Sequence, residues 1–170
     1  MLFVKCVSPP KGGRFTVGRI YIAIDDLEGE AASRSSFHLS DDYGARVGSR
    51  FNDGCFIEQE EVYACCIKST GDFKAGEIIR ASGVDDNSFH LAGFGWFNSA
   101  NFEILDSSNL GIGDYLWDEP AGRWAAIRAI RDEDQAVQVN GDKDFRLLDD
   151  FSITVEDGAI LTCPKSINSK

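Results

Sequence analysis

Long apolar runs are absent from this sequence. The longest unbroken ones cover residues 20–24 and 62–67, far fewer than the roughly 20 residues that a membrane-spanning helix needs. The N-terminal residues also lack the layout of a signal peptide, because apolar side chains precede the first charge and Pro9-Pro10 follows soon after. We therefore expect a cytoplasmic protein with no membrane contact.

Basic residues are scarce. The sequence has 17 lysine and arginine residues against 28 aspartate and glutamate residues, which leaves a net charge of −11. This sign is wrong for a protein that neutralises nucleic-acid phosphates. Each of the segments 1–60, 61–108 and 109–170 is separately net negative. The charge balance therefore argues against direct nucleic-acid binding and favours a protein partner with a basic surface.

Sequence patterns for metal sites, disulfides and catalysis are missing as well. The five cysteines are odd in number and form no Cys-x-x-Cys pair, which favours reduced, buried thiols. There is no His-Glu-x-x-His motif, calcium-binding loop, phosphate-binding glycine loop or Gly-x-Ser-x-Gly motif. The two histidines, His38 and His90, occupy matching places and are predicted to face away from the core. We expect no enzymatic activity, no cofactor and no metal.

What the sequence does contain is an internal repeat. Residues 13–20 (GRFTVGRI) match residues 71–78 (GDFKAGEI), and the tripeptide Phe-His-Leu occurs at 37–39 and again at 89–91. In a more diverged third copy, residues 122–124 (GRW) stand for the first of these signatures. Each copy closes with paired aromatic residues at nearly even spacing. We predict that the first members of these pairs occupy equivalent positions, namely Phe51, Phe97 and Phe145.

The β-rich runs of the chain are short and stop at acidic turns. The runs include residues 19–24 and 77–80, and the turns are Asp25-Asp26, Asp85-Asp86 and Asp132-Glu133-Asp134. About four or five strands in some 45 residues predict a small curved barrel, because so short a chain buries an interior only by rolling one sheet on itself. The predicted fold class is therefore all-β, with three tandem small barrels.

The repeat also sets the expected domain boundaries. The first barrel covers residues 1–60 with a surface loop insertion at 27–36, the second covers 61–108, and the diverged third covers 109–157. Residues 158–170 are expected to form a C-terminal strand or tail. Barrels of this size are marginally stable alone, so we expect the three to pack on one another.

One segment, residues 120–135, has two interpretations. Pro120 at a first helical position, with Trp124, Ile127 and Ile130 on one stripe, is typical of a capped helix. The register of the repeat predicts a strand instead. We favour the strand, because tertiary context often overrides local propensity.

The first copy points to a family. Residues 15–21 (FTVGRIY), an acidic hairpin, residues 39–44 (LSDDYG) and residues 49–51 (SRF) together resemble the small SH3-like barrel proteins of bacteriophages and bacteria. The second copy keeps residues 73–78 but has Gly-Phe-Gly at 93–95 in place of the aspartate hairpin. The third copy has lost the second glycine of the signature and carries Ala126-Ile127 there. The resemblance implies a binding module and says nothing about catalysis.

The expected function is that of a non-enzymatic, acidic protein-binding factor. From the resemblance, we expect a phage-encoded inhibitor or modulator of a host nucleic-acid-handling or defence complex. The alternative is a small enzyme or nucleotide-binding protein with a site between modules, where pockets often form.

The candidate binding residues are an acidic turn and three tryptophans. The turn is expected to attract a basic partner at long range, and the tryptophans to anchor it. Phe94, Trp96 and Phe97 are also candidates for lining a peptide groove of the SH3 kind. The competing interpretation places the tryptophans in the core. The predicted site residues are Asp132, Glu133, Asp134, Trp96, Trp117 and Trp124.

Overall fold

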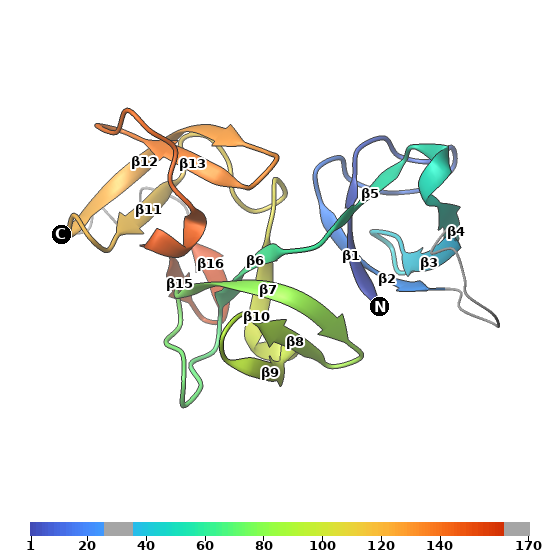
Figure 1. Ribbon diagram of the computed structural model, residues 1–170, viewed down its shortest axis with the longest axis horizontal. Coiled ribbons are helices and arrows are strands. Elements are labelled where there is room, and N and C mark those ends of the chain that lie inside the picture. Colours follow the sequence, from blue (N-terminus) through green and yellow to red (C-terminus); the bar gives the residue numbers. More distant parts are fainter. Residues whose placement is uncertain (26–35, 162–170) are drawn as a thin grey trace. The chain divides into compact units, whose positions relative to one another are not determined.

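The computed structural model describes residues 1–25 and 36–161 of the chain (Figure 1). These residues form sixteen strands and three 3-10 turns, so the expected all-β class is confirmed. The predicted loop insertion at 27–36 lies outside the described residues except for Ser36. Within the described part, no helix is long and apolar enough to cross a membrane.

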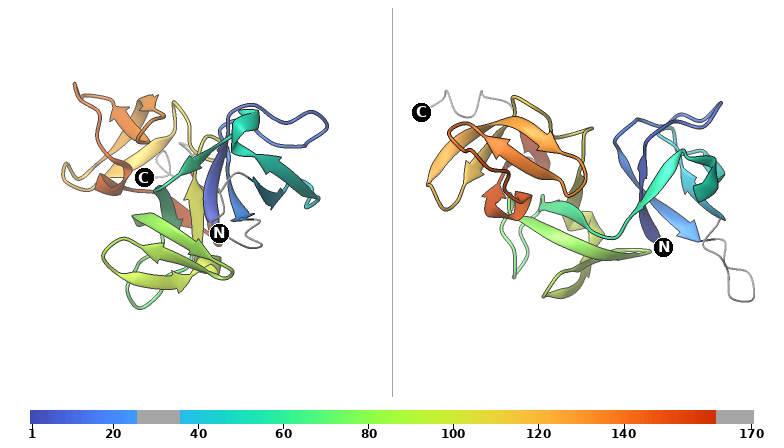
Figure 2. Two further views of the ribbon diagram at one scale, coloured as in Figure 1. Left: turned by 45° about the vertical axis from the view of Figure 1, so that its right-hand side comes forward. Right: turned by 45° about the horizontal axis from the view of Figure 1, so that its top comes forward.

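The first sheet is an antiparallel meander with a late return to its first strand. Its strand order is β5-β1-β2-β3-β4, and the 3-10 turn η1 (Phe51–Asp53) connects β4 to β5. The strands are β1 (Leu2–Cys6), β2 (Ile20–Asp25), β3 (Ser36–Ser40), β4 (Arg46–Arg50) and β5 (Phe56–Gln59). Figure 2 shows this sheet curling on itself from two directions.

The second sheet repeats this order. It runs β10-β6-β7-β8-β9, again with a 3-10 turn, η2 (Ser99–Asn101), before the returning strand. Its alternation of burial follows the predicted pattern, since Phe89 and Leu91 are buried while His90 faces the other side. The strands are β6 (Val62–Cys66), β7 (Ile78–Asp85), β8 (Ser88–Leu91), β9 (Gly95–Asn98) and β10 (Phe102–Leu105).

The third sheet keeps four strands of the same order. It runs β14-β11-β12-β13, and an isolated bridge between Val137 and Arg146 stands where the fourth strand of a meander would be. The strands are β11 (Tyr115–Asp118), β12 (Arg123–Arg131), β13 (Ala136–Val139) and β14 (Phe151–Ser152), with η3 (Leu148–Asp150) before β14. A separate hairpin follows, formed by β15 (Thr154–Glu156) and β16 (Ala159–Leu161). Strand β16 lies at the start of the segment 158–170 that is expected to form a C-terminal strand or tail, and residues 162–170 lie outside the described residues.

Strand β12 decides between the two interpretations of residues 120–135. It pairs with β11 on one side and with β13 on the other. Ala125 and Ile127 point into the core, as the alternation of a strand requires. The strand prediction is confirmed and the helical alternative is wrong, because two neighbouring strands satisfy backbone groups that a helix would pair within itself.

Hydrogen bonds correct the alignment of the third copy. In all three sheets a glycine amide donates at 2.7 to 2.8 Å to the last carbonyl of the sheet's first strand, the pairs being Gly18 to Cys6, Gly76 to Cys66 and Gly122 to Asp118. Gly122 is therefore the second glycine of the signature, not the first, and that glycine has not been lost. Sequence spacing does not reveal this equivalence, because the connection before Gly122 is much shorter than its two counterparts.

The closing aromatic residues need the same correction. Phe51 opens η1, Phe97 lies within β9 and Phe145 lies outside the strands, so these three do not share one element. Strand pairing marks the next phenylalanine of each copy instead. The equivalent residues are buried and lie opposite the last residue of the first strand, in the pairs Cys6 with Phe56, Cys66 with Phe102 and Asp118 with Phe151.

The short connection in the third copy changes what covers this phenylalanine. In the first two copies the long loop supplies an aromatic ring that packs edge-on, Phe15 on Phe56 at 5.1 Å and Phe73 on Phe102 at 5.9 Å between centroids. The third loop is too short to supply one. The guanidinium of Arg146 covers Phe151 instead, 4.5 Å from the ring centroid.

Arg146 also binds the carboxylate that replaces the buried cysteine. Asp118 is 1% exposed, and Arg146 donates to both of its oxygens, at 2.7 Å and 2.9 Å. The amide of Ala121 donates to the same carboxylate at 3.3 Å. These hydrogen bonds, that from Arg146 foremost, hold the pKa of the Asp118 carboxyl below its usual range. The third copy thus has an ion pair between a buried carboxylate and a partly exposed guanidinium where the other two have a thiol and an aromatic ring.

By their internal contacts the residues group into two compact units. The first unit comprises Met1–Val62, Ala81–Phe97 and Asp106–Ser108, and the second comprises Tyr63–Arg80, Asn98–Leu105 and Asn109–Lys170. Each has its own buried cluster, centred on Phe37 and Phe56 in the first and on Leu116 and Phe151 in the second. The division into three domains at residues 60 and 108 stays a prediction.

Candidate protein-binding surface

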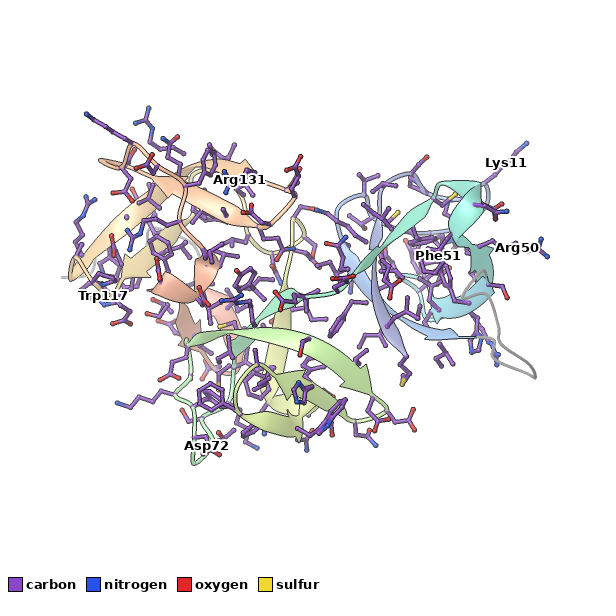
Figure 3. The ribbon with its side chains drawn as sticks, viewed as in Figure 1. Lys11, Arg50, Phe51, Asp72, Trp117 and Arg131 are labelled. Atoms are coloured by element: carbon purple, nitrogen blue, oxygen red, sulfur yellow. The ribbon has the colours of Figure 1, made fainter. Side chains whose placement is uncertain are left out.

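The structure does not bring the six predicted binding residues together. Trp96 belongs to the first unit, whereas the acidic turn, Trp117 and Trp124 belong to the second. Within the second unit the turn follows the end of β12 at Arg131, seven residues from Trp124. At about 3.3 Å per residue this separates them by roughly 23 Å. Trp117 and Arg131 accordingly lie well apart on this unit in Figure 3.

The acidic turn is exposed but partly neutralised. Asp132, Glu133 and Asp134 connect β12 to β13 at the surface. Arg131 donates to both oxygens of Asp134, at 2.9 Å and 2.8 Å, and this hydrogen-bonded pairing lowers the pKa of the Asp134 carboxyl. The turn therefore presents less net negative charge than its three carboxylates suggest.

Trp117 and Trp124 form a cross-strand pair on the outer face of the third sheet. Their ring centroids lie 5.3 Å apart with the planes at 71°. Their neighbours Leu116 and Ala125 point to the opposite face and are buried. Both tryptophans are half-buried, so each ring covers part of the other. They are not core residues, and they offer a partner only part of their surface.

Trp96 behaves differently because its ring stands in solvent. Trp96 is 56% exposed and Phe94 is 61% exposed. Phe97, the third member of the predicted groove, is half-buried and alternates to the other side of β9. A turn closed by the Phe94 amide and the Leu91 carbonyl at 3.0 Å, with Gly93 at φ +84°, places the two exposed rings at the start of β9. We call Phe94, Trp96 and His90 the aromatic patch.

The exposed indole of Trp96 is held by three residues on neighbouring strands. His90 of β8 meets it nearly edge-on, with ring centroids 5.2 Å apart, and the His90 Nδ1 lies 3.0 Å from the hydroxyl of Ser82. Gly83 leaves room beneath the ring, since a Cβ there would lie 3.4 Å from the indole. A β-bulge between Ala81 and Gly83 brings Ser82 to this face. The Trp96 ring is thus packed against residues of β7 and β8.

The sequence predicts Trp96 and Phe94 as binding residues but does not indicate which residues pack against the Trp96 ring. The alternation of Phe-His-Leu correctly predicted that His90 faces outward, yet assigned it no role. Gly83 inside a β-rich run was a usable signal, because an isolated glycine in a strand often marks a bulge or a close approach. What no pattern indicated was that Ser82, Gly83 and His90 lie under one ring.

A hollow of about 280 Å³ adjoins the patch within the first unit. Ser82 and Gly83 form one of its walls, and Glu58 and Glu60 form part of another. The surrounding segments 51–62 and 81–97 contain six aspartate or glutamate residues and no lysine or arginine. These two segments therefore carry a net negative charge.

A larger hollow, of about 460 Å³, lies in the second unit. It is lined by Glu119, Asp149 and Ser152 among others. Its polar groups already bind one another or their neighbours, because Ser152 donates to Glu119 at 2.9 Å and Arg80 lies 3.3 Å from Asp149. Such internal pairing is typical of structural contacts, so this hollow is the weaker candidate.

The three buried thiols of the described residues are not activated nucleophiles, because burial raises their pKa values. Four cysteines there are free, three of them buried, and Cys163 lies outside the described residues. Burial raises the pKa of the Cys65 thiol to about 12, which leaves it protonated at neutral pH. Among residues 1–25 and 36–161 no group of three or more histidine, cysteine or acidic side chains could hold a metal ion.

Comparison of the chain with protein-family models, with curated proteins and with solved structures finds no match. Function has to be inferred from the geometry of the aromatic patch and the charges around it.

Proposed function

We propose that the protein is a non-enzymatic binding module that docks a basic segment of a partner protein on the aromatic patch. The observation that carries this is the exposure of Phe94, just before β9, and of Trp96 within it, each more than half open to solvent. Paired exposed aromatic rings are unfavourable in an isolated soluble protein and are typical of interaction sites. Tryptophan in particular is enriched among the residues that dominate binding energy.

The charge around the patch supports a basic partner. The walls of the adjoining hollow carry Glu58 and Glu60. Asp85 ends β7 and Asp86 begins the turn that follows it, and both are exposed. A chain of net charge −11 attracts a basic surface at long range and repels an acidic one. The exposed rings would then supply the affinity, and also cation–π contacts to lysine or arginine of the partner.

The proposal extends to the architecture. Three tandem SH3-like barrels are supported by the repeated strand order of the sheets, the 3-10 turn before each returning strand, and the glycine-to-carbonyl bond that recurs in all three. The acidic turn at Asp132–Asp134 is a second surface, which attracts the basic partner at long range. As the partner we propose a host nucleic-acid-handling or defence complex with a basic face, in keeping with the phage proteins that the first copy resembles.

The alternative of a small enzyme or nucleotide-binding protein has less support. Its best location in the described chain is the 460 Å³ hollow of the second unit, where Glu119 and Asp149 are already engaged by Ser152 and Arg80. A catalytic carboxylate needs to be available to substrate.

Site-specific photo-crosslinking tests the binding proposal. A photoreactive phenylalanine analogue replaces Phe94 in one sample and Ile112 in another, since Ile112 is a 70% exposed apolar residue of the second unit and serves as the matched control. We expect one basic protein to be crosslinked from position 94 and not from position 112. Excess unlabelled protein should suppress this crosslink, while excess Trp96→Ala protein should not.

Equal crosslinking from both positions would overturn the proposal. So would competition by the Trp96→Ala protein as effective as that by the parent protein. The Trp96→Ala variant is expected to fold, because its ring contributes little to the buried core.

A further inference from the structure

We infer that the partner binds as an extended strand added to the free edge of β9, so that backbone hydrogen bonds accompany the contacts of the aromatic patch. This rests on the proposed function and names the mode of binding at the same surface. Strand β9 is the last in the order β10-β6-β7-β8-β9, and the described part of the sheet has no strand on its other side. An edge position of this kind is where strand addition places a further strand, joined by a backbone ladder.

The composition of this edge sets it apart from the other edges. Sheet edges are usually protected against pairing by charged side chains or proline. Residues 87–102, which include β8, β9 and η2, contain no aspartate, glutamate, lysine, arginine or proline, although 26% of the whole chain is charged. Strand β9 itself reads Gly-Trp-Phe-Asn.

The equivalent strand of the first sheet provides the contrast. Strand β4 also ends its sheet, but arginine residues stand at both of its ends, Arg46 and Arg50, and both are exposed. The remaining edges of the first two sheets each carry a carboxylate, Glu58 in β5 and Glu103 in β10. Of these four edges, therefore, only β9 lacks a charged residue.

The side chains and charges of the site select the occupant. Successive residues of an added strand point to alternate faces, so every second side chain of the partner would reach the face where Trp96 stands over Gly83. The nearby carboxylates of Glu58, Glu60, Asp85 and Asp86 favour lysine or arginine at those positions. A second copy of this chain fits poorly, because like charges would meet at an overall charge of −11. The occupant is a basic, extended segment of another protein.

The test uses a synthetic peptide of alternating lysine and valine, seven residues long and capped at both ends, added to the full-length protein labelled with ¹⁵N. We expect the peptide to shift the Trp96 indole resonance, assigned with a Trp96→Phe variant, and to slow amide hydrogen exchange in β9. The β4 amides are the internal control and should not change, since Arg46 and Arg50 repel the peptide. The charge-reversed peptide, with glutamate for lysine, should not bind.

Two further peptides test the backbone contribution directly. They keep every side chain but carry N-methyl groups at the odd or at the even residues, which removes the donors along one edge or the other. One of the two should bind at least tenfold more weakly than the parent peptide, while the other should bind nearly as well.

Equal binding of all three basic peptides would overturn strand addition and leave docking on the patch intact. No protection of β9 at millimolar peptide would also overturn it. Protection of β9 that grows with protein concentration without peptide would show that a second copy occupies the edge, again contradicting the inference. The failure of the binding proposal itself is separate, because it is read from the crosslinks at position 94.

Discussion

Replacing Arg146 by methionine tests whether the third copy depends on its buried ion pair. The variant leaves the Asp118 carboxylate buried, with one remaining donor, the Ala121 amide at 3.3 Å. Removing one partner of a buried pair costs about 3–5 kcal/mol, and loss of the cation over Phe151 adds ~0.5–1 kcal/mol. We expect the free energy of unfolding to fall by about 3.5–6 kcal/mol, a large part of the roughly 5–15 kcal/mol that stabilises a typical domain.

A second substitution restores the arrangement of the other two copies. Asp118→Cys places a thiol at the position equivalent to Cys6 and Cys66, and it removes the carboxylate that Arg146→Met leaves without its ion-pair partner. Replacing a buried pair by apolar groups of similar size is often nearly neutral, so the double variant should recover at least ~2 kcal/mol relative to Arg146→Met alone. This coupling is the quantity that a double-mutant cycle isolates.

The pH dependence has a defined sign. Because Arg146 lowers the pKa of Asp118 in the folded protein, the pair stabilises the fold above the unfolded pKa of about 3.9, and this contribution is lost as the pH falls through the lower folded pKa. In Arg146→Met the carboxyl lacks that partner and is protonated more readily. The difference between parent and variant should therefore be largest at neutral pH and narrow below about pH 4.

Urea denaturation followed by tryptophan fluorescence measures these energies. A Trp96→Phe background leaves Trp117 and Trp124, both in the second unit, as the reporters. A loss below ~1 kcal/mol for Arg146→Met, or a double variant no more stable than the single one, would refute the idea that Asp118 and Arg146 form one buried unit.

Two further predictions concern single positions. Gly76→Ala should destabilise the protein by at least ~2 kcal/mol more than Gly122→Ala in urea denaturation. Both glycines have positive φ, so an alanine at either position bears a backbone cost of about 1–2 kcal/mol, but a Cβ at Gly76 would lie 2.2 Å from the Ile153 carbonyl oxygen while a Cβ at Gly122 meets open space. Equal losses of stability would contradict the close approach at Gly76. In a Cys163→Ser background, Ellman's reagent should modify the partly exposed Cys55 quickly. It should modify the buried Cys6, Cys65 and Cys66 only on unfolding, because burial raises the pKa values of their thiols. Rapid modification of more than one thiol would contradict the burial of these three cysteines.

Much of the local structure followed from sequence patterns. Short β-rich runs ended at Asp85-Asp86 and at Asp132–Asp134 as expected, and the Phe-His-Leu alternation placed the histidines away from the core. The repeat register correctly favoured a strand at Arg123–Arg131 over a helix. These features are local because each depends on side chains two residues apart or on a tight turn, which a pattern of neighbours specifies.

The sequence was less informative where residues meet across long separations. Gly122 was misaligned because its loop is short, and only its bond to the Asp118 carbonyl showed which glycine it replaces. The prediction of the six binding residues rests on charge and residue type alone, and the structure divides these residues between the two units. The acidic turn and Trp124 lie at opposite ends of β12.

The surface around Trp96 was decided by tertiary structure alone. All three tryptophans follow the same outward alternation in their strands, so sequence pattern cannot separate a half-buried indole from an exposed one. Trp117 and Trp124 cover each other because β11 and β12 pair in a register that sets them opposite. Trp96 has no such partner strand beyond β9, and stands exposed over Gly83 and against His90. The physical reason is strand order: whether a side chain meets another strand or solvent depends on which strand comes next in the sheet, and that is a long-range property of the fold.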